Sequence, residues 1–317
     1  IAFNEAFLPG PCAGNFTLTR TWVAEDDCGN SVSVQQVVVV TNDSEPQFDS
    51  VPGDITVECD NIPTAPTLTA NNDCGANVDV TYTEVRVDGS CPDSYLLVRT
   101  WTAADDCGNT AKVTQNITVR DTKAPVFNSQ PADVTVECNA VPSAAVLTAT
   151  DNCDADVNVT YNQVTTPGPC QDAYILTRTW IAIDNCGNAT THVQKVTVVD
   201  TTPPVLTGVP DDVTAECGAI NIPPVATVTG SDNCDANVQV TFTETKIDGA
   251  CPDSYTLIRL WTATDNCGNT ATGQQTISVG DNTPPEFTST PVNVTVECDA
   301  VPAVPNLTAT DNCDVNV

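Results

Sequence analysis

The feature of this sequence that most restricts its fold is a unit of about 79 residues that recurs along the chain. The four tryptophans, Trp22, Trp101, Trp180 and Trp261, mark four copies at nearly constant spacing. Each lies in a strand-like Arg-x-Trp run that leads into an acidic loop ending in Cys-Gly-Asn, and a sister Asn/Asp-rich loop with a cysteine lies earlier in each whole module. The chain is therefore a series of copies of one module, and its function has to be explained for that module.

The 317 residues contain three whole modules and two partial ones. We predict whole modules at 42–120, 121–199 and 200–280, with the C-terminal half of a module at 1–41 and the N-terminal half of another at 281–317. Solenoid repeats of about 20–50 residues lean on their neighbours, whereas a unit of this size can enclose its own core. We expect beads on a string, joined by stiff proline linkers into a rod spanning on the order of 150 Å.

Charge and cysteine content restrict the environment and the partners. The net charge is −31, with 41 acidic against 10 basic residues, which argues against nucleic acid because phosphate binding needs a basic surface. Sixteen cysteines with no Cys-x-x-Cys pair indicate a disulfide framework in an oxidising, extracellular compartment instead of a zinc ribbon. The longest apolar run, 37–40, is far shorter than the roughly 20 residues that a membrane span needs.

Alternating apolar residues predict an all-β fold. In the second module the pattern predicts strands at 133–138, 146–150, 157–161, 174–183 and 190–199. Gly, Pro, Asn and Asp fill the gaps, as turns require, and no stretch has a convincing helical period. We therefore expect tandem immunoglobulin-like β-sandwich modules, with room for one or two short extra strands between the third and the fourth.

Strand direction also predicts a pairing of the cysteines. If consecutive strands alternate in direction, neighbouring cysteines lie at opposite ends of a module, about 26 Å apart for an eight-residue strand, whereas bonded cysteines have Cα atoms about 5.5–6 Å apart. The first cysteine of a module is then expected to bond the third, and the second the fourth. The predicted bonds are Cys59–Cys91, Cys74–Cys107, Cys138–Cys170, Cys153–Cys186, Cys217–Cys251 and Cys234–Cys267, which leaves Cys12, Cys28, Cys298 and Cys313 without partners.

Several stretches resemble hyalin-type (HYR-like) repeats. They are the Asp-Thr-Thr-Pro-Pro linker at 200–204, the Asp-Val-Thr-Val-Glu-Cys opening at 133–138 and the Thr-Ala-Thr-Asp-Asn-Cys-Gly-Asn-Thr-Ala closing at 262–271. The cysteine-rich form is similar to modules of giant surface adhesins of Bacteroidota, including the SprB-like gliding-motility adhesins. The resemblance covers essentially the whole chain, and it implies an immunoglobulin-like fold, export to the cell surface by the type IX route, and adhesive or structural roles.

The acidic loops predict calcium between modules. Both loops are expected to lie at one end of a module, where its linker Asp also begins, and calcium takes about 6–8 oxygen ligands; turn formation alone is the other explanation for these residues. The candidate ligands are Asp121, Asp151, Asn152, Asp154, Asp184, Asn185, Asn188, Asp200, Asp232, Asn233, Asp235, Asp265, Asn266, Asn269, Asp281 and Asp311. The start of the first module, with Asn42, Asn72 and Gly75, is expected to bind more weakly.

No catalytic site is predicted. The single histidine, His192, is replaced by Val113 and Gly273 in the other modules, and nothing recurs around it that would hold a base beside a nucleophile, so we expect a surface strand residue. The arginine two residues before each tryptophan has two explanations. It forms a surface patch for a glycan or partner, or it lies inside the sandwich, stacked on Trp or paired with a carboxylate; the apolar face around it favours the inside.

These observations predict a non-enzymatic, repetitive segment of a large secreted bacterial surface adhesin. It would be a structural and adhesive filament with calcium-stiffened joints, in gliding motility, whose partners are further copies of the module and an unidentified surface or glycan. The alternative is a stalk that carries an enzyme or carbohydrate-binding domain outside this segment. If the chain comes from Bacteroidota, its Asp-Ser and Asp-Thr motifs predict O-glycosylation at Ser50 and Thr201.

Overall fold

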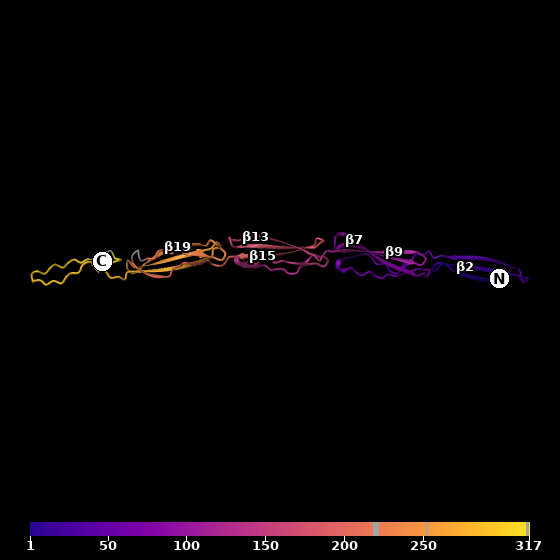
Figure 1. Cartoon of the computed structure of the whole chain (residues 1–317), viewed down its shortest axis with the longest axis horizontal. Coiled ribbons are helices and arrows are strands. Elements are labelled where there is room, and N and C mark those ends of the chain that lie inside the picture. Colours follow the sequence, from indigo (N-terminus) through magenta and orange to yellow (C-terminus); the bar gives the residue numbers. More distant parts are fainter. Residues whose placement is uncertain (218–221, 252, 315–316) are drawn as a thin grey trace. The chain divides into compact units, whose positions relative to one another are not determined.

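A computed structural model describes residues 1–217, 222–251, 253–314 and 317 (Figure 1). The chain is an all-β protein of tandem immunoglobulin-like modules, as the strand pattern predicted. Within the described ranges the helical elements are two single turns, η1 (Cys59–Asn61) and η2 (Cys138–Ala140). No helix among these residues is long and apolar enough to cross a membrane.

The first whole module shows the arrangement of strands. It contains β4 (Gln47–Phe48), β5 (Ile55–Glu58), β6 (Ala70–Asn71), β7 (Val78–Cys91), β8 (Ser94–Asp105) and β9 (Thr110–Arg120). One sheet has the order β5-β9-β8-β7, with β7 and β9 labelled in Figure 1, and β4 pairs with β6 in a second sheet. Because β5 is parallel to β9 while β8 is antiparallel to both β7 and β9, strands β5, β7 and β9 share one direction and β8 runs against them.

The other modules repeat these elements. The second contains β10 (Val126–Phe127), β11 (Val134–Glu137), β12 (Ala149–Thr150), β13 (Asn158–Pro167), β14 (Tyr174–Ile183) and β15 (Ala189–Val199). The third contains β16 (Val205–Thr207), β17 (Val213–Glu216), β18 (Thr229–Ser231), β19 (Gln239–Asp248), β20 (Tyr255–Thr264) and β21 (Thr270–Gly280). The partial modules contain β1 (Ala2–Pro9), β2 (Phe16–Glu25), β3 (Ser31–Val40), β22 (Glu286–Phe287) and β23 (Ala309–Thr310). All five strands predicted in the second module form; the short extra strand, β10, precedes the first of them instead of following the third.

The buried face of β8 explains why the Arg-x-Trp run recurs. From Leu97 onward every second residue of this strand is buried, including Trp101 at 2% exposure and Ala103 at 0%. The indole nitrogen of Trp101 donates to the carbonyl oxygen of Pro66 at 3.2 Å, so its polar atom is satisfied inside the core. Ile117 and Val119 of β9 pack beside Leu97 to complete the core of this module.

The chain divides into two compact units. One contains residues 1–130, 146–161 and 180–192, and the other contains 131–145, 162–179 and 193–317. The boundary runs through the repeat at 121–199, so the linkers that begin at Asp121 and Asp200 each lie inside a unit together with the loops around them.

The disulfides connect neighbouring modules, and the predicted pairing within modules is wrong. The bonds are Cys12–Cys107, Cys59–Cys153, Cys91–Cys186, Cys138–Cys234, Cys170–Cys267 and Cys217–Cys313, with partners 94–97 residues apart. None of the predicted bonds Cys59–Cys91, Cys74–Cys107, Cys138–Cys170, Cys153–Cys186, Cys217–Cys251 and Cys234–Cys267 forms. Cys28, Cys74, Cys251 and Cys298 are free and exposed, whereas Cys12 and Cys313, expected to lack partners, are bonded.

The physical reason for the error lies at the module ends. Cys59 follows β5 and Cys91 ends β7, and these strands share a direction, so both cysteines lie at one end of the first module, as expected. Cys107 follows the opposed strand β8 and lies at the other end. Two cysteines at the same end were expected to bond each other. Instead each bonds a cysteine of the adjoining module, because the linker brings the end of one module against the start of the next.

Candidate metal sites at the joints between modules

Three carboxylates meet where the first module joins the second. Asp121 begins the linker, Asp151 lies in the loop after β12, and Asp184 lies in the loop after β14; one oxygen of each lies within 4.8 Å of the others. Asp121 is 6% exposed and Asp184 is 5% exposed. The structure thus brings together the linker and both acidic loops at this place, which we call the Asp121 joint.

The next linker repeats this cluster. Asp200, Asp232 and Asp265 also have one carboxylate oxygen each within 4.8 Å of one another, and Asp200 and Asp265 are buried. We call this the Asp200 joint. The same chemistry at equivalent positions of successive modules follows from the repeat and gives two examples of one site.

In each acidic loop, one carboxylate oxygen of the aspartate accepts hydrogen bonds from main-chain amides of the same loop. Oδ1 of Asp184 accepts hydrogen bonds from the amides of Cys186 (2.9 Å) and Asn188 (2.8 Å), and Gly187, at φ 90°, completes the turn. Oδ1 of Asp151 accepts the amides of Cys153 (2.8 Å) and Asp154 (3.1 Å). These bonds fix the positions of both aspartates in their loops.

Several of the clustered oxygens are buried without a hydrogen-bond donor. Among the described residues, neither carboxylate oxygen of Asp121 has a partner, and neither do Oδ2 of Asp200, Oδ2 of Asp232 and Oδ2 of Asp311. Buried polar atoms are nearly always hydrogen-bonded, because leaving a donor or acceptor unpaired away from water is costly. The unpaired acceptors of Asp121, and those of Asp200 and Asp232, therefore make the two joints candidate cation sites.

Burial and mutual repulsion shift the ionisation of the linker aspartates. Burial raises the pKa of Asp121 to about 6, with further contributions from the charges of Asp151 and Asp184. The amide of Lys123 lies close enough to offset part of this rise without meeting hydrogen-bond geometry. Burial likewise raises the pKa of Asp200, opposed by the amide of Thr202. A divalent cation would reverse both effects by favouring the ionised carboxylates.

Most of the other predicted ligands shape the loops instead of joining the carboxylates. At the Asp121 joint, the side chain of Asn188 donates to Oδ2 of Asp184 (2.9 Å) and to the main-chain oxygen of Asp121 (3.3 Å), which fixes the linker against the loop. Oδ2 of Asp154 accepts the amide of Asn185 (2.9 Å), and this bond ties the two acidic loops together. The side chain of Asn185 donates to Asp93 of the preceding module at 2.6 Å.

The Asp200 joint uses its matching residues in the same way. Asn269 donates to Asp265 (2.8 Å) and to the main-chain oxygen of Asp200 (3.1 Å). Asp235 accepts the amide of Asn266 (2.9 Å). Of the last two predicted ligands, Asp281 lies in a cluster with Glu216, and Asp311 keeps one unpaired oxygen.

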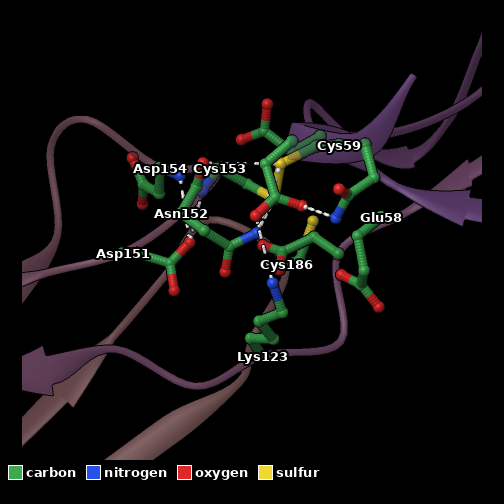
Figure 2. Close-up of a disulfide and its surroundings, with 12 residues drawn as sticks. Glu58, Cys59, Lys123, Asp151, Asn152, Cys153, Asp154 and Cys186 are labelled. Carbon is green, nitrogen blue, oxygen red and sulfur yellow. Dashed lines mark hydrogen bonds and ion pairs between the residues drawn. A yellow bond between two sulfur atoms is a disulfide. The ribbon is translucent and has the colours of Figure 1, made fainter. Parts of the chain in front are cut away.

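One of the two disulfides of the Asp121 joint, Cys59–Cys153, lies beside the first acidic loop (Figure 2). Figure 2 shows Cys59, which directly follows β5, against Cys153 in the loop that also holds Asp151. The amide of Asn152 in this loop contacts the sulfur of Cys153 at 2.8 Å and that of Cys59 at 3.5 Å. At the Asp200 joint, Asn233 contacts the sulfurs of Cys234 and Cys138 in the same way. Asn152 and Asn233 thus pack on the bonds that cross the joints.

A glutamate from the preceding module was missed by the sequence analysis. A carboxylate oxygen of Glu58 lies within 4.8 Å of one of Asp121, and Glu137 and Asp200 form the same pair at the next joint. Glu58 also accepts a hydrogen bond from the hydroxyl of Thr122 at 2.6 Å. The sequence did contain a signal, because a glutamate directly precedes the first cysteine of every whole module. That glutamate points to the metal site only once this cysteine is known to bond across the joint.

The joint at the start of the first whole module, which we call the Asn42 joint, has the same linker and loops but lacks two of the three aspartates. Asn42 and Asn72 replace two of the three aspartates, and the third, Asp105, remains; all three are buried. Both amides donate to Oδ2 of Asp105, Asn42 at 3.3 Å and Asn72 at 3.1 Å, and Asn109 adds a third bond at 2.9 Å. Burial opposes the ionisation of Asp105, but the hydrogen bonds from Asn109 and the loop amides outweigh it and lower its pKa. This joint satisfies its own carboxylate and has no need of a cation.

The recurring arginines of the three whole modules are buried, as favoured from the sequence, and two of them pair with carboxylates. Arg99, 4% exposed, donates from Nε to Glu84 at 2.8 Å, and Arg259 makes the same bond to Glu244 at 2.7 Å. In the second module the acceptor is the neutral Gln163, at 3.0 Å from Arg178. The patch that these arginines were considered to form on the surface is therefore absent from the described modules.

The structure also places His192 and the two predicted glycosylation positions, Ser50 and Thr201. His192 is half-buried in β15 with its ring 5.9 Å from that of Trp180 and 6.3 Å from that of Phe127, so it packs on aromatic rings and is not a freely exposed surface residue. Ser50 is exposed in the segment between β4 and β5. Thr201 is exposed, and its hydroxyl donates to Glu137 at 2.5 Å.

Comparison with known proteins finds likeness only among solved structures. No protein-family model matches the chain, and no curated protein sequence matches it. The chain is similar to the protocadherin GammaB4 extracellular domain (TM-score 0.40, 17% identity, 96% of this chain and 67% of that chain). It is also similar to Drosophila N-cadherin EC1-4 (0.27, 14%, 86% and 85%) and to mouse cadherin-23 EC22-24 (0.34, 14%, 75% and 100%). Likenesses at these values carry no argument about function, which has to rest on this chain's own residues.

Proposed function

We propose that this chain is a non-enzymatic segment of an extracellular structural and adhesive protein, in which calcium and disulfides hold immunoglobulin-like modules in series. One observation carries the proposal. At two successive joints three aspartates converge, and two disulfides connect the modules on either side. Buried oxygens of Asp121 at one joint, and of Asp200 and Asp232 at the other, lack a hydrogen-bond donor. Residues that serve a joint between modules, and not a pocket within one, support a role in holding the array together.

The donor set fits calcium better than a transition metal. Every candidate ligand is a carboxylate, amide or main-chain oxygen, and hard oxygen ligands select Ca²⁺ or Mg²⁺. The cysteine sulfurs nearest the clusters are in disulfides and offer no thiolate for zinc. Asp121, Asp151 and Asp184 supply three carboxylates, Glu58 beside Asp121 is a candidate fourth, and water would complete the roughly 6–8 oxygens of calcium. The Asn42 joint, whose amides satisfy its single aspartate, would bind calcium weakly or not at all.

The cysteines support an extracellular location. Twelve cysteines form six disulfides, which persist in oxidising surroundings such as the outside of a cell. The resemblance of the linkers and loops to HYR-like repeats supports the narrower assignment to a type IX-exported surface adhesin of Bacteroidota that acts in gliding motility. We further propose that modules begin at residues 42, 121, 200 and 281, that they form a rod, and that further copies of the module are its partners.

The test is made on intact cells of the source organism. An antibody raised against residues 42–280 should label unpermeabilised cells, and deletion of the encoding region should reduce their attachment to a solid surface. Alkylation of surface protein before reduction should leave the bonded cysteines unmodified. Protein found only inside the cell with all sixteen cysteines alkylated would overturn the proposal. Mass spectrometry of the same material would show whether Ser50 and Thr201 carry the proposed glycans.

A further inference from the structure

We propose that the disulfides make this array a load-bearing element whose greatest length is limited by covalent bonds, whether or not its modules remain folded. This inference rests on the proposed structural role and specifies the load that the structure can carry. It follows from where the cysteines lie on the strands, since both ends of the central strand of the first and second modules, β8 and β14, are bonded to other modules.

The central strands are joined end to end. Cys91 lies just before β8 and bonds Cys186, which lies just after β14 of the next module. Cys170 lies before β14 and bonds Cys267, just after β20. Cys107, after β8, bonds Cys12, which precedes β2. One covalent line therefore runs through β2, β8, β14 and β20 without following the linkers.

The β8 segment of this line is already nearly fully extended. The backbone between Cys91 and Cys107 consists mostly of β8, which is 12 residues long. A strand rises about 3.3 Å per residue, and a chain stretched taut reaches only about 3.3–3.6 Å per residue. Tension along the line therefore gains very little length from it. A reduced module of about 79 residues would instead lengthen to roughly 260–285 Å when unfolded.

A second covalent line also connects the modules. Cys59 bonds Cys153, and the backbone leads back from Cys153 through β12 and η2 to Cys138, which bonds Cys234. From Cys234 the backbone leads back in the same way to Cys217, which bonds Cys313. The Asp121 and Asp200 joints are each crossed by two disulfides in addition to the backbone. Loss of one connection at either joint leaves two others in place.

These bonds set a calculable limit on extension. The shortest covalent path between the chain ends uses three disulfides, Cys12–Cys107, Cys91–Cys186 and Cys217–Cys313, and about 62 residues of backbone. With about 16 Å for the three bonds, the limit is roughly 220–240 Å even if every module unfolds. The reduced chain of 317 residues would reach roughly 1,040–1,140 Å. Pairing within modules would leave a path of about 217 residues and a limit of roughly 730–800 Å.

The experiment is to stretch single molecules of the oxidised 317-residue chain between handles ligated to its termini, with the free thiols alkylated. We expect extension to stop at about 230 Å. Adding a water-soluble phosphine, which takes the oxygen of water as it reduces each disulfide to two thiols, should raise the limit to about 1,100 Å. An oxidised chain that stretches beyond about 700 Å would overturn the proposal. Adhesion is not measured, so this outcome is separate from failure of the proposed function on cells.

Two matched variants, each lacking one disulfide, test the path itself. Replacing Cys217 and Cys313 by serine removes a bond of the shortest path, and the next path contains about 93 residues, so the limit should rise to roughly 320–350 Å. Replacing Cys91 and Cys186 by serine leaves an alternative of about 63 residues through Cys138–Cys234, so the limit should stay at about 230 Å. Equal limits in the two variants would contradict the connected lines, and peptide mapping beforehand verifies that the remaining bonds have formed.

Discussion

The chain contains its own control for calcium, because the Asn42 joint and the Asp121 joint share a framework and differ in charge. Changing Asp121 and Asp151 to asparagine copies the first joint onto the second. At the first joint the side chains of Asn42 and Asn72 donate to the remaining aspartate. We expect the double variant to make equivalent bonds to Asp184, to keep its fold, and to lose calcium at this joint alone.

The size and the sign of the effect of calcium on stability can also be worked out. A ligand present at 100 times its Kd adds about 2.7 kcal/mol to folded stability, and 1 kcal/mol shifts the Tm of a 60–100-residue domain by about 4–8 °C. Calcium bound at the Asp121 joint should therefore raise the Tm of the wild-type module that it stabilises by roughly 10–20 °C. Without calcium, the raised pKa of Asp121, about 6 against 3.8, corresponds to at most about 3 kcal/mol of destabilisation at neutral pH, which the variant relieves.

The order of stabilities should consequently reverse with calcium. Thermal melts in millimolar calcium should rank the wild type above the Asp121→Asn, Asp151→Asn variant, and melts in chelator should rank the variant above the wild type. Calorimetric titration should find one calcium fewer in the variant. The reciprocal change, Asn42→Asp with Asn72→Asp, should add one site.

Two results would refute this reasoning. One is a wild-type Tm that does not change between calcium and chelator, which would make the acidic loops turns and nothing more. The other is a variant that loses stability equally in both conditions, because a general packing defect does not depend on calcium. Unchanged calcium numbers in both reciprocal variants would show that the bound ions lie elsewhere.

Three further predictions follow from the same contacts. In chelator, the stability of the chain should fall as the pH rises from about 4 to above 6, because burial raises the folded pKa of Asp121 and its unfavourable ionisation is complete only above that value; melts across this range check the sign. Glu84→Gln should cost under about 1 kcal/mol because Gln163 already serves in this place, whereas Glu84→Ala should cost about 1–3 kcal/mol by leaving Arg99 buried without this acceptor, measured by denaturant unfolding. A single protease cut anywhere between the first and last bonded cysteines should release no fragment on a non-reducing gel, since a disulfide spans every such position.

The strands could be predicted because the alternation of apolar and polar residues within each segment determines them. In the second module the period-two alternation located β14 at Tyr174–Ile183, matching the expected 174–183, since one face is buried along its whole length. The two-residue strand Val126–Phe127 was missed because a strand so short has no period to read. The approach of the linker aspartates to the acidic loops was also predicted, because strand direction alone places those loops at one end.

The cysteine partners could not be predicted from within one module. Strand direction correctly placed Cys59 and Cys91 at one end, but direction does not say whether two cysteines at that end face each other or face the next module. That choice depends on how closely a linker brings two modules together, which no pattern inside a module encodes. Glu58 was missed for the same reason, since it serves a joint whose other residues lie beyond position 120.

The sequence separation of the bonded cysteines also determines how long a cysteine waits for its partner during synthesis. Each bond joins residues 94–97 positions apart, so the first cysteine of a pair remains a thiol until about 95 more residues have been made. At synthesis rates of about 5–20 residues per second, this delay is roughly 5–20 s. During it, the nearest oxidation partner of Cys59 is Cys91, at the same end of its own module, and a bond between them would prevent both correct ones. The newest module of a growing chain is therefore always the one exposed to mispairing, and it matures only when its successor has folded against it.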